Sequence, residues 1–170
     1  GSSGTEGENN TAVGRYAGYS TTTGNSNTFV GNAAGYANTT GIYNNFFGHG
    51  AGQNNTTAVQ STYIGWYAGY YQQVGGNNVA IGHQTLYGAS GKANSSSNNV
   101  AVGYQAAYGS DAGAGLVAIG KGALRNASDS GSYSVAIGFD SAYYATGSYN
   151  TFVGANAGTG GTTSAPYSSG

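Results

Sequence analysis

Cysteine is absent from the 170-residue chain, and proline occurs once, at Pro166. Without cysteine, a disulfide scaffold and a cysteine-ligated metal are excluded. Charged residues make up 5% of the sequence and the formal net charge is −1, so there is no basic surface to hold nucleic acid or an anionic membrane. No apolar run approaches the ~18 residues of a membrane-spanning helix. We therefore expect no nucleic-acid partner, no membrane insertion by this segment and no cofactor.

Glycine, in contrast, is abundant, with 33 residues that follow a repeat. A five-residue phrase of the type Asn-Val-Ala-Ile-Gly, as at 78–82, returns from one end of the sequence to the other. Its closing residues, called the anchor glycines, are Gly14, Gly31, Gly48, Gly65, Gly82, Gly103, Gly120, Gly138 and Gly154. Five of the eight intervals between them are 17 residues. Because glycine recurs at fixed offsets, the pattern predicts a folded repeat protein and not a disordered low-complexity chain.

A repeat of about 17 residues is too short for a helical pair or a propeller blade, which need roughly 34 to 45 residues. It suffices for one coil of a β-solenoid, in which each strand pairs with its copy in the next coil at about 4.8 Å. Residues 9–158 are therefore predicted to form an all-β parallel solenoid of about nine coils. Residues 1–8 are expected to be a leader or expression-derived residues, and residues 159–170 an irregular tail.

Two apolar columns run through the predicted strands. The residue before each anchor glycine is always Val, Ile or Phe, and this column is predicted to fill the coil interior. The preceding column then faces outward, where it is alanine in five repeats and aromatic in four. An exposed apolar column needs a cover, and another copy of the chain is the simplest one. The candidate interface residues are Phe29, Phe46, Tyr63 and Phe152.

Two further columns follow the anchor glycine. The third residue after it is small in every repeat, as Ala34 and Ala68 illustrate, and fits the inner wall of a slim coil. The fifth is tyrosine in six of nine repeats. We expect these tyrosines to stack as a ladder that covers the backbone, with a carbohydrate-binding stripe as the alternative. A longer interval places an insertion at 88–97, and insertions in repeat proteins often map to a binding face.

The densest aromatic group on the chain comprises Trp66, Tyr67, Tyr70 and Tyr71. Trp66 occupies a column that carries Arg15 or Lys121 in other repeats, and a column that tolerates charge is exposed. Since aromatic faces stack on sugar rings, this group is the candidate binding site for a neutral glycan. Packing between chains is the alternative interpretation.

The repeat phrase resembles the head repeats of trimeric autotransporter adhesins of the YadA type, and similar repeats occur in phage tail fibres. The best local match is 134–148, with the strand phrase followed by the loop Ala145-Thr146-Gly147-Ser148. The resemblance covers nearly the whole of 9–158. It implies a left-handed parallel β-roll, assembled as a side-by-side homotrimer, that serves as an adhesive or receptor-binding element outside the cell, on a bacterial surface or a phage tail fibre.

The expected function is therefore that of a non-catalytic fibre or adhesin head domain that attaches to a cell-surface receptor or glycan, or acts as a rigid fibre segment. One alternative is a tailspike-type enzyme that degrades polysaccharide, which would need a pair of carboxylates in a groove. The five acids are scattered: Glu6, Glu8, Asp111, Asp129 and Asp140. A second alternative is an ice-binding solenoid, but the threonine clusters near 21–23, 39–40 and 56–57 fade by the fourth repeat.

Overall fold

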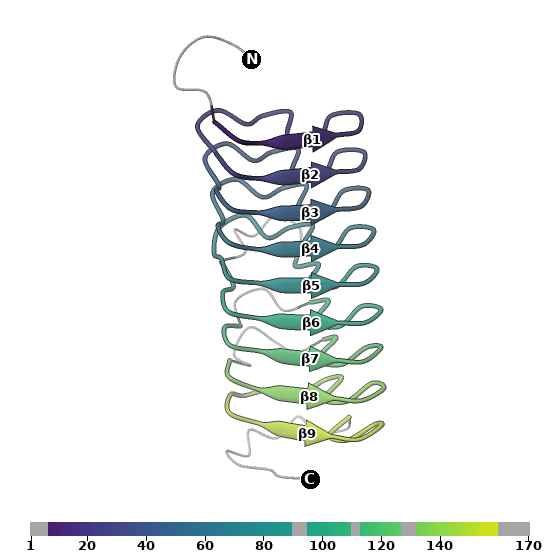
Figure 1. The fold of residues 1–170 in the computed structure, drawn as a ribbon. Helices are drawn as coiled ribbons and strands as arrows, with labels where there is room; N and C mark the ends of the chain where they lie inside the picture. Colours follow the sequence, from purple (N-terminus) through teal and green to yellow (C-terminus); the bar gives the residue numbers. More distant parts are fainter. Residues whose placement is uncertain (1–6, 90–94, 110–112, 127–131, 160–170) are drawn as a thin grey trace.

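The computed structural model describes residues 7–89, 95–109, 113–126 and 132–159. These residues form a β-solenoid without a helix, in which each coil contributes one short strand (Figure 1). The strands are β1 (Thr11–Val13), β2 (Thr28–Val30), β3 (Asn45–Phe47), β4 (Thr62–Ile64), β5 (Val79–Ile81), β6 (Val100–Val102), β7 (Val117–Ile119), β8 (Val135–Ile137) and β9 (Thr151–Val153). All pair in parallel in sequence order, with equivalent positions of the repeat in register. The predicted all-β solenoid is confirmed.

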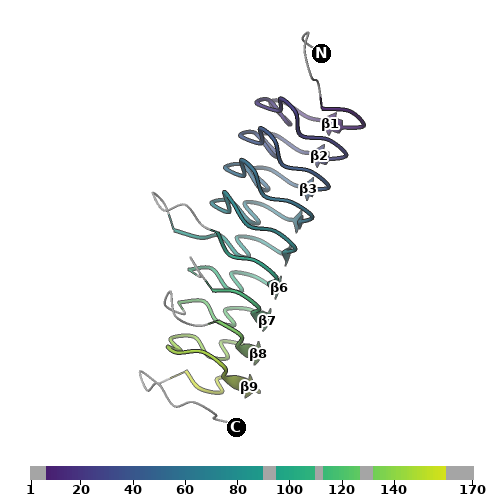
Figure 2. The same ribbon diagram turned by 90° about the vertical axis from the view of Figure 1, so that its left-hand side faces the viewer.

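The nine strands stack along one side of the rod, and the rest of each coil extends to the other side (Figure 2). β1 and β9 lie at opposite ends. Most of the predicted leader, most of the 159–170 tail and the middle of the 88–97 insertion lie outside the described residues, as do Glu6, Asp111 and Asp129.

The anchor glycines end the strands in a conformation that other residues rarely adopt. Their φ angles lie between 125° and 138°, a region in which a side chain is strained. There is also no room for a side chain, because a Cβ at Gly82 would lie 2.7 Å from the carbonyl oxygen of Gly103 in the next coil. The anchor position therefore requires glycine both for its φ angle and for the close approach of stacked backbones.

A column of asparagines precedes six of the nine strands and joins neighbouring coils. Asn44 Nδ2 donates a hydrogen bond to the carbonyl oxygen of Ala58 at 2.8 Å, and Asn44 Oδ1 accepts one from the backbone N–H of Ser61 at 3.1 Å. Asn27 and Asn99 make the same two types of bond. A single asparagine side chain thus supplies both the donor and the acceptor that the buried backbone of two coils needs.

The predicted assignment of strand faces was wrong, because the two apolar columns are exchanged. Phe29, Phe46 and Tyr63 are at most 1% exposed and fill the interior of the single chain, and Phe152 packs against the same core. None of the three buried rings is available to another copy. The outward column consists of Val13, Val30, Phe47, Ile64, Ile81, Val102, Ile119, Ile137 and Val153, and most of these side chains are 38–57% exposed. Alternation puts the columns on opposite faces, but it does not say which face is inside when both are apolar.

The interior is filled by two complementary types of coil. Where the strand carries an aromatic ring, the residue six positions later is glycine, and a Cβ at Gly52 would lie 2.5 Å from the ring of Phe46. In the coils of β5 and β7 the strand carries alanine and the same later position holds leucine, and Leu86 fills the space beside Ala80 with no exposed surface. The replacement of an aromatic ring and glycine by alanine and leucine therefore conserves volume within the core. The coils of β1, β6 and β8 do not follow this exchange, because their alanine is paired with Gly18, Ala107 or Ala142.

The column of small residues, three positions after the anchor glycine, lines the inner wall as predicted. Its members Ala34, Ala51, Ala68, Thr85, Ala106, Ala123 and Ser141 are fully buried.

Candidate functional site

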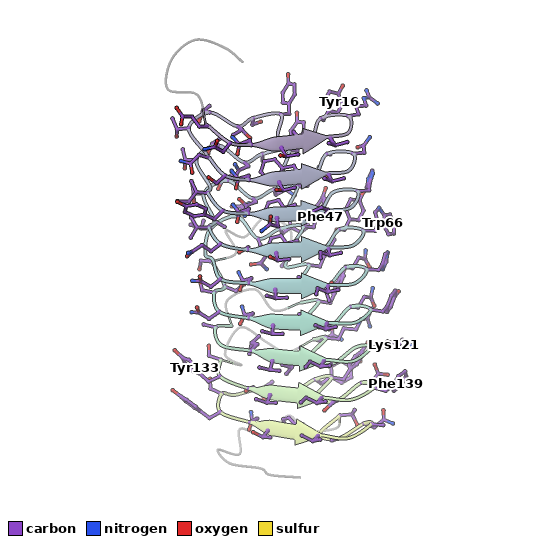
Figure 3. The ribbon with its side chains drawn as sticks, in the orientation of Figure 1. Tyr16, Phe47, Trp66, Lys121, Tyr133 and Phe139 are labelled. Carbon is purple, nitrogen blue, oxygen red and sulfur yellow. The ribbon has the colours of Figure 1, made fainter. Side chains whose placement is uncertain are left out.

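The residues directly after the anchor glycines, called the tip column, lie on the loops that leave the strands. In Figure 3 the side chains of Trp66, Lys121 and Phe139 project along this edge of the rod, and Phe47 lies over the sheet. Trp66 is 47% exposed, which confirms the predicted exposure of this column.

Side chains of the tip column stack from coil to coil. The ring centroids are 4.6 Å apart between Trp66 and His83, and 5.1 Å between His83 and Tyr104, whose planes differ by 7°. His49 stands on the other side of Trp66 at 6.5 Å. The two histidines are thus separated by Trp66, and no group of three potential metal-ligating side chains occurs within the described residues.

The four predicted aromatic residues do come together. The ring centroids of Trp66 and Tyr67 are 4.7 Å apart, those of Tyr67 and Tyr70 are 4.6 Å apart, and those of Tyr70 and Tyr71 are 4.6 Å apart. His49 Nε2 lies 3.3 Å from the hydroxyl oxygen of Tyr67. We call the group of Trp66, Tyr67, Tyr70 and Tyr71 the aromatic ridge.

The predicted tyrosine ladder runs beside the tip column. Tyr70 and Tyr87 stack with centroids 5.2 Å apart, and Tyr87 and Tyr108 with centroids 4.9 Å apart. The pKa of Tyr87 is raised to about 12, mainly by burial and to a smaller extent by the neighbouring phenols of Tyr71 and Tyr108. The ladder is therefore a packed structural element, consistent with the expectation that stacked side chains cover the backbone.

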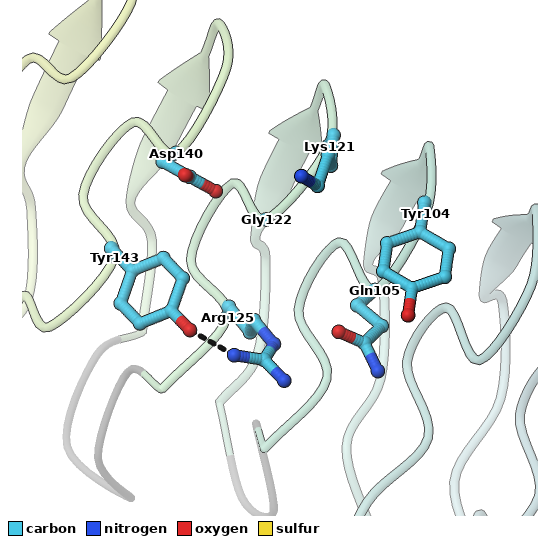
Figure 4. A pocket seen from close by; sticks show the side chains of 7 residues that line it. All are labelled: Tyr104, Gln105, Lys121, Gly122, Arg125, Asp140 and Tyr143. Carbon is cyan, nitrogen blue, oxygen red and sulfur yellow. Dashed lines mark hydrogen bonds between the residues drawn. The ribbon is translucent and has the colours of Figure 1, made fainter.

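The ladder and the tip column become cationic toward the C-terminal coils. There they enclose a cleft of about 220 Å³, lined by Tyr104, Gln105, Lys121, Gly122, Arg125, Asp140 and Tyr143 (Figure 4). The guanidinium carbon of Arg125 lies 5.6 Å from the ring centroid of Tyr108 and 5.4 Å from that of Tyr143, so Arg125 takes the place of a tyrosine in the stack.

This cleft is not among the sites predicted from the sequence. The repeat contained the signal, because Lys121 and Arg125 occupy the tip and ladder positions of one coil, and Asp140 belongs to the adjacent coil. Coils that pair in register bring such positions to within about 5 Å of one another along the rod. Charged side chains at these positions would therefore have been expected to gather.

Catalytic carboxylates are not paired in the described part of the chain. Glu8, before β1, and Asp140, after β8, are the two described carboxylates, and they lie at opposite ends of the rod. The threonine column is also occupied, since the hydroxyls of Thr22, Thr39 and Thr56 each donate to a backbone carbonyl in the next coil at 2.9–3.1 Å. Those hydroxyls stabilise the solenoid.

Among the described residues, no helix has the length and apolar character needed to cross a membrane. In comparisons with family models, curated proteins and solved structures, no match to this chain is found.

The outer face of the sheet is the second notable surface. None of the nine strands contains a charged residue. In β5 to β8 both outward positions are aliphatic, as in the pairs Val79 with Ile81 and Val117 with Ile119. These side chains form one continuous apolar strip, because the strands pair in register.

Proposed function

We propose that the chain is a non-catalytic segment of an extracellular fibre, in which three left-handed rolls lie side by side and attach to a glycan on a cell surface. The observation that carries the proposal is the combination of two surfaces on one rigid rod. One is the uncharged apolar sheet face, and the other is the exposed aromatic ridge on a separate edge.

The sheet face supports assembly of copies. Its outward column leaves Ile64, Ile81, Ile119 and Ile137 between 38% and 40% exposed over most of the length of the rod. Such a strip is unfavourable in water and is stabilised when a like surface covers it. Closed cyclic assembly covers the strip on every copy and avoids open-ended growth. This interface replaces the one predicted from Phe29, Phe46, Tyr63 and Phe152.

The aromatic ridge supports glycan attachment. Trp66 exposes nearly half of its surface, and Tyr67, Tyr70 and Tyr71 are half-buried around it. No charged side chain belongs to the ridge, so ring stacking and hydrogen bonding are the available attractions, and these suit a neutral sugar. Single sites of this kind are weak, and their repetition on a trimeric fibre strengthens attachment through multivalency.

The experiment is a glycan array followed by binding to whole cells with wild type, Trp66→Ala and Asn32→Ala. Asn32 is the matched control because it is an exposed polar member of the same tip column. Wild type and Asn32→Ala are expected to bind at ~0.5 M salt, since screening weakens only charge-driven contacts. Trp66→Ala should lose binding at an unchanged melting temperature. Equal binding by Trp66→Ala would make the segment a rigid spacer of the fibre.

A further inference from the structure

The cleft at the C-terminal end of the ladder gathers an unusual share of the few charges on the chain. Lys121 and Arg125 line it, and Arg15 is the one other cation among the described residues. Asp140 lines the same cleft from the adjacent coil. Figure 4 shows the two cations and Asp140 around one space, with no hydrogen bond between them.

Arg125 is held in a fixed orientation. Its guanidinium lies between the rings of Tyr108 and Tyr143, and its Nη1 donates to the Tyr143 hydroxyl. Its Nε is buried and has no hydrogen-bond partner in the described part of the chain. A cation fixed in this way loses little entropy on binding an anion, and its planar N–H groups match a carboxylate.

Acceptor groups line the remaining walls of the cleft. Gln105 Nε2 donates to Gln84 Oε1 at 2.8 Å. The Oε1 atom of Gln105 is an acceptor that can take a hydrogen bond from a ligand hydroxyl. A Cβ at Gly122 would overlap the Asp140 carboxylate, so the missing side chain makes room for this group. Asp140 and Gln105 can accept hydrogen bonds from hydroxyls, and Tyr104 offers an aromatic ring at the rim.

We propose that this cleft binds a carboxylate-bearing sugar, one uronic acid unit of an acidic polysaccharide. The carboxylate lies against Lys121 and Arg125, and the ring hydroxyls donate to Asp140 and Gln105. The volume of about 220 Å³ is below the ~300 Å³ at which pockets for drug-sized ligands begin, and suits a single sugar ring.

The cleft is continuous with the aromatic ridge, and the inference rests on the proposed glycan attachment. Tyr104 stacks on His83, which in turn packs on Trp66. Three coil steps, about 14 Å, separate Trp66 from Lys121. One polysaccharide strand can therefore contact the ridge with a neutral unit and the cleft with an acidic one.

The test is calorimetric titration of the full chain with an oligogalacturonate, a neutral galactose oligosaccharide and a sulfated galactose oligosaccharide. The variants are Arg125→Gln and the exposed Lys121→Gln. The control is Arg15→Gln, because Arg15 also lies over a tyrosine ring, that of Tyr16 at 4.5 Å, but at the other end of the rod. Arg125→Gln and Lys121→Gln are each expected to weaken oligogalacturonate binding about tenfold or more. Both cleft variants should bind the neutral oligosaccharide as tightly as wild type. Arg15→Gln should bind all three oligosaccharides as tightly as wild type.

The preference for oligogalacturonate over the neutral oligosaccharide should also disappear between ~50 mM and ~500 mM salt. The inference would be overturned if wild type bound oligogalacturonate and the neutral oligosaccharide equally at low salt. It would also be overturned if Arg15→Gln lost as much oligogalacturonate affinity as the cleft variants. Tighter binding of the sulfated oligosaccharide would overturn the assignment to a uronic acid. Trp66→Ala separates this inference from the proposed ridge. If it leaves every affinity unchanged while Arg125→Gln removes the acidic preference, the ridge fails and the cleft stands.

Discussion

Phe46 and Phe47 are consecutive residues of β3 whose side chains lie on opposite sides of the sheet. Phe46 has no exposed surface, and its ring stacks on that of Tyr63 in the next coil with centroids 4.8 Å apart. Phe47 is 38% exposed on the outer face. The interior of each coil is thus complete within one chain, and the outer column is the apolar surface that another copy can cover.

Phe46→Ala is expected to lower the free energy of unfolding by about 3 to 5 kcal/mol, because it opens a cavity in the core. Phe47→Ala should instead weaken association, so that its melting temperature depends more steeply on protein concentration than that of wild type. Thermal melts followed by circular dichroism at two concentrations separate these effects. The same loss in both variants at every concentration would contradict the assignment of faces.

The exchange of volume within a coil gives a second test. Gly52→Leu alone should destabilise the chain, because the added side chain meets the Phe46 ring. The double variant Phe46→Ala with Gly52→Leu should recover stability, because it reproduces the pairing of Ala80 with Leu86. The backbone permits this exchange, since Gly52 and Leu86 both have left-handed φ angles, 56° and 47°. A double-mutant cycle measures the coupling. Additive losses would show that the two positions do not share one space.

Gly82→Ala and Gly154→Ala distinguish backbone strain from steric overlap. Both glycines have φ near 130°, at 133° and 129°, so both variants should lose about 1 to 3 kcal/mol through strain. A Cβ at Gly82 also meets the backbone of Gly103, whereas at Gly154 the nearest atom, the Cβ of Ala157, is 3.9 Å away. Denaturant titration should find Gly82→Ala the less stable variant, and equal stabilities would contradict the close approach of stacked coils.

Asn44→Ala and Asn45→Ala compare a buried asparagine with its exposed neighbour. Removal of the Asn44 amide leaves the Ala58 carbonyl and the Ser61 N–H without their partners, and each buried unpaired group is destabilising by about 1 to 3 kcal/mol. Asn45 is exposed in β3, so its variant should unfold within ~0.5 kcal/mol of wild type. Chemical denaturation checks both. A negligible effect of Asn44→Ala would mean that the asparagine column does not hold the coils together.

Three tyrosines that are buried or half-buried predict that stability falls at high pH. Burial raises the pKa of Tyr63 and Tyr70, and burial together with neighbouring phenols raises that of Tyr87 to about 12. Because the folded chain holds these protons more tightly than an unfolded tyrosine with a pKa of about 10, this contribution is complete below pH ~10. It is lost as the pH rises from about 10 through 12. Unfolding free energies measured at about pH 9 and pH 11 should show the decline, with a smaller decline in Tyr87→Phe, and a constant value would contradict it.

The sequence alone predicted the features that depend on period. The interval between anchor glycines predicted the coil, and the column of Ala34 and Ala68 predicted the inner wall. The aromatic group around Trp66 was predicted because the tip column tolerates charge and is therefore exposed. The faces of the strands could not be predicted from alternation, since both columns are apolar. The pairing of Phe46 with Gly52 and of Ala80 with Leu86 does indicate the inward face. A large residue at one position goes with a small residue at the other, as expected when both side chains fill the same interior space.

The cleft required knowledge of how adjacent coils align. Lys121 and Asp140 are 19 residues apart in the sequence, and only pairing of β7 with β8 in register brings their loops together. Figure 4 shows that the side chains also converge on one space, which depends on their rotamers and on the missing side chain at Gly122. Position in the repeat could have suggested the neighbourhood, but not the cleft.

Light scattering at micromolar protein concentration measures the proposed assembly of copies through the outer sheet face. Wild type is expected to have three times the chain mass of 16.8 kDa. Ile119→Asp should be a folded single chain, because the assembly would bury uncompensated charges. Asn32→Asp, which adds the same charge in the tip column, should keep the mass of wild type. A stable, soluble wild-type monomer would contradict the account.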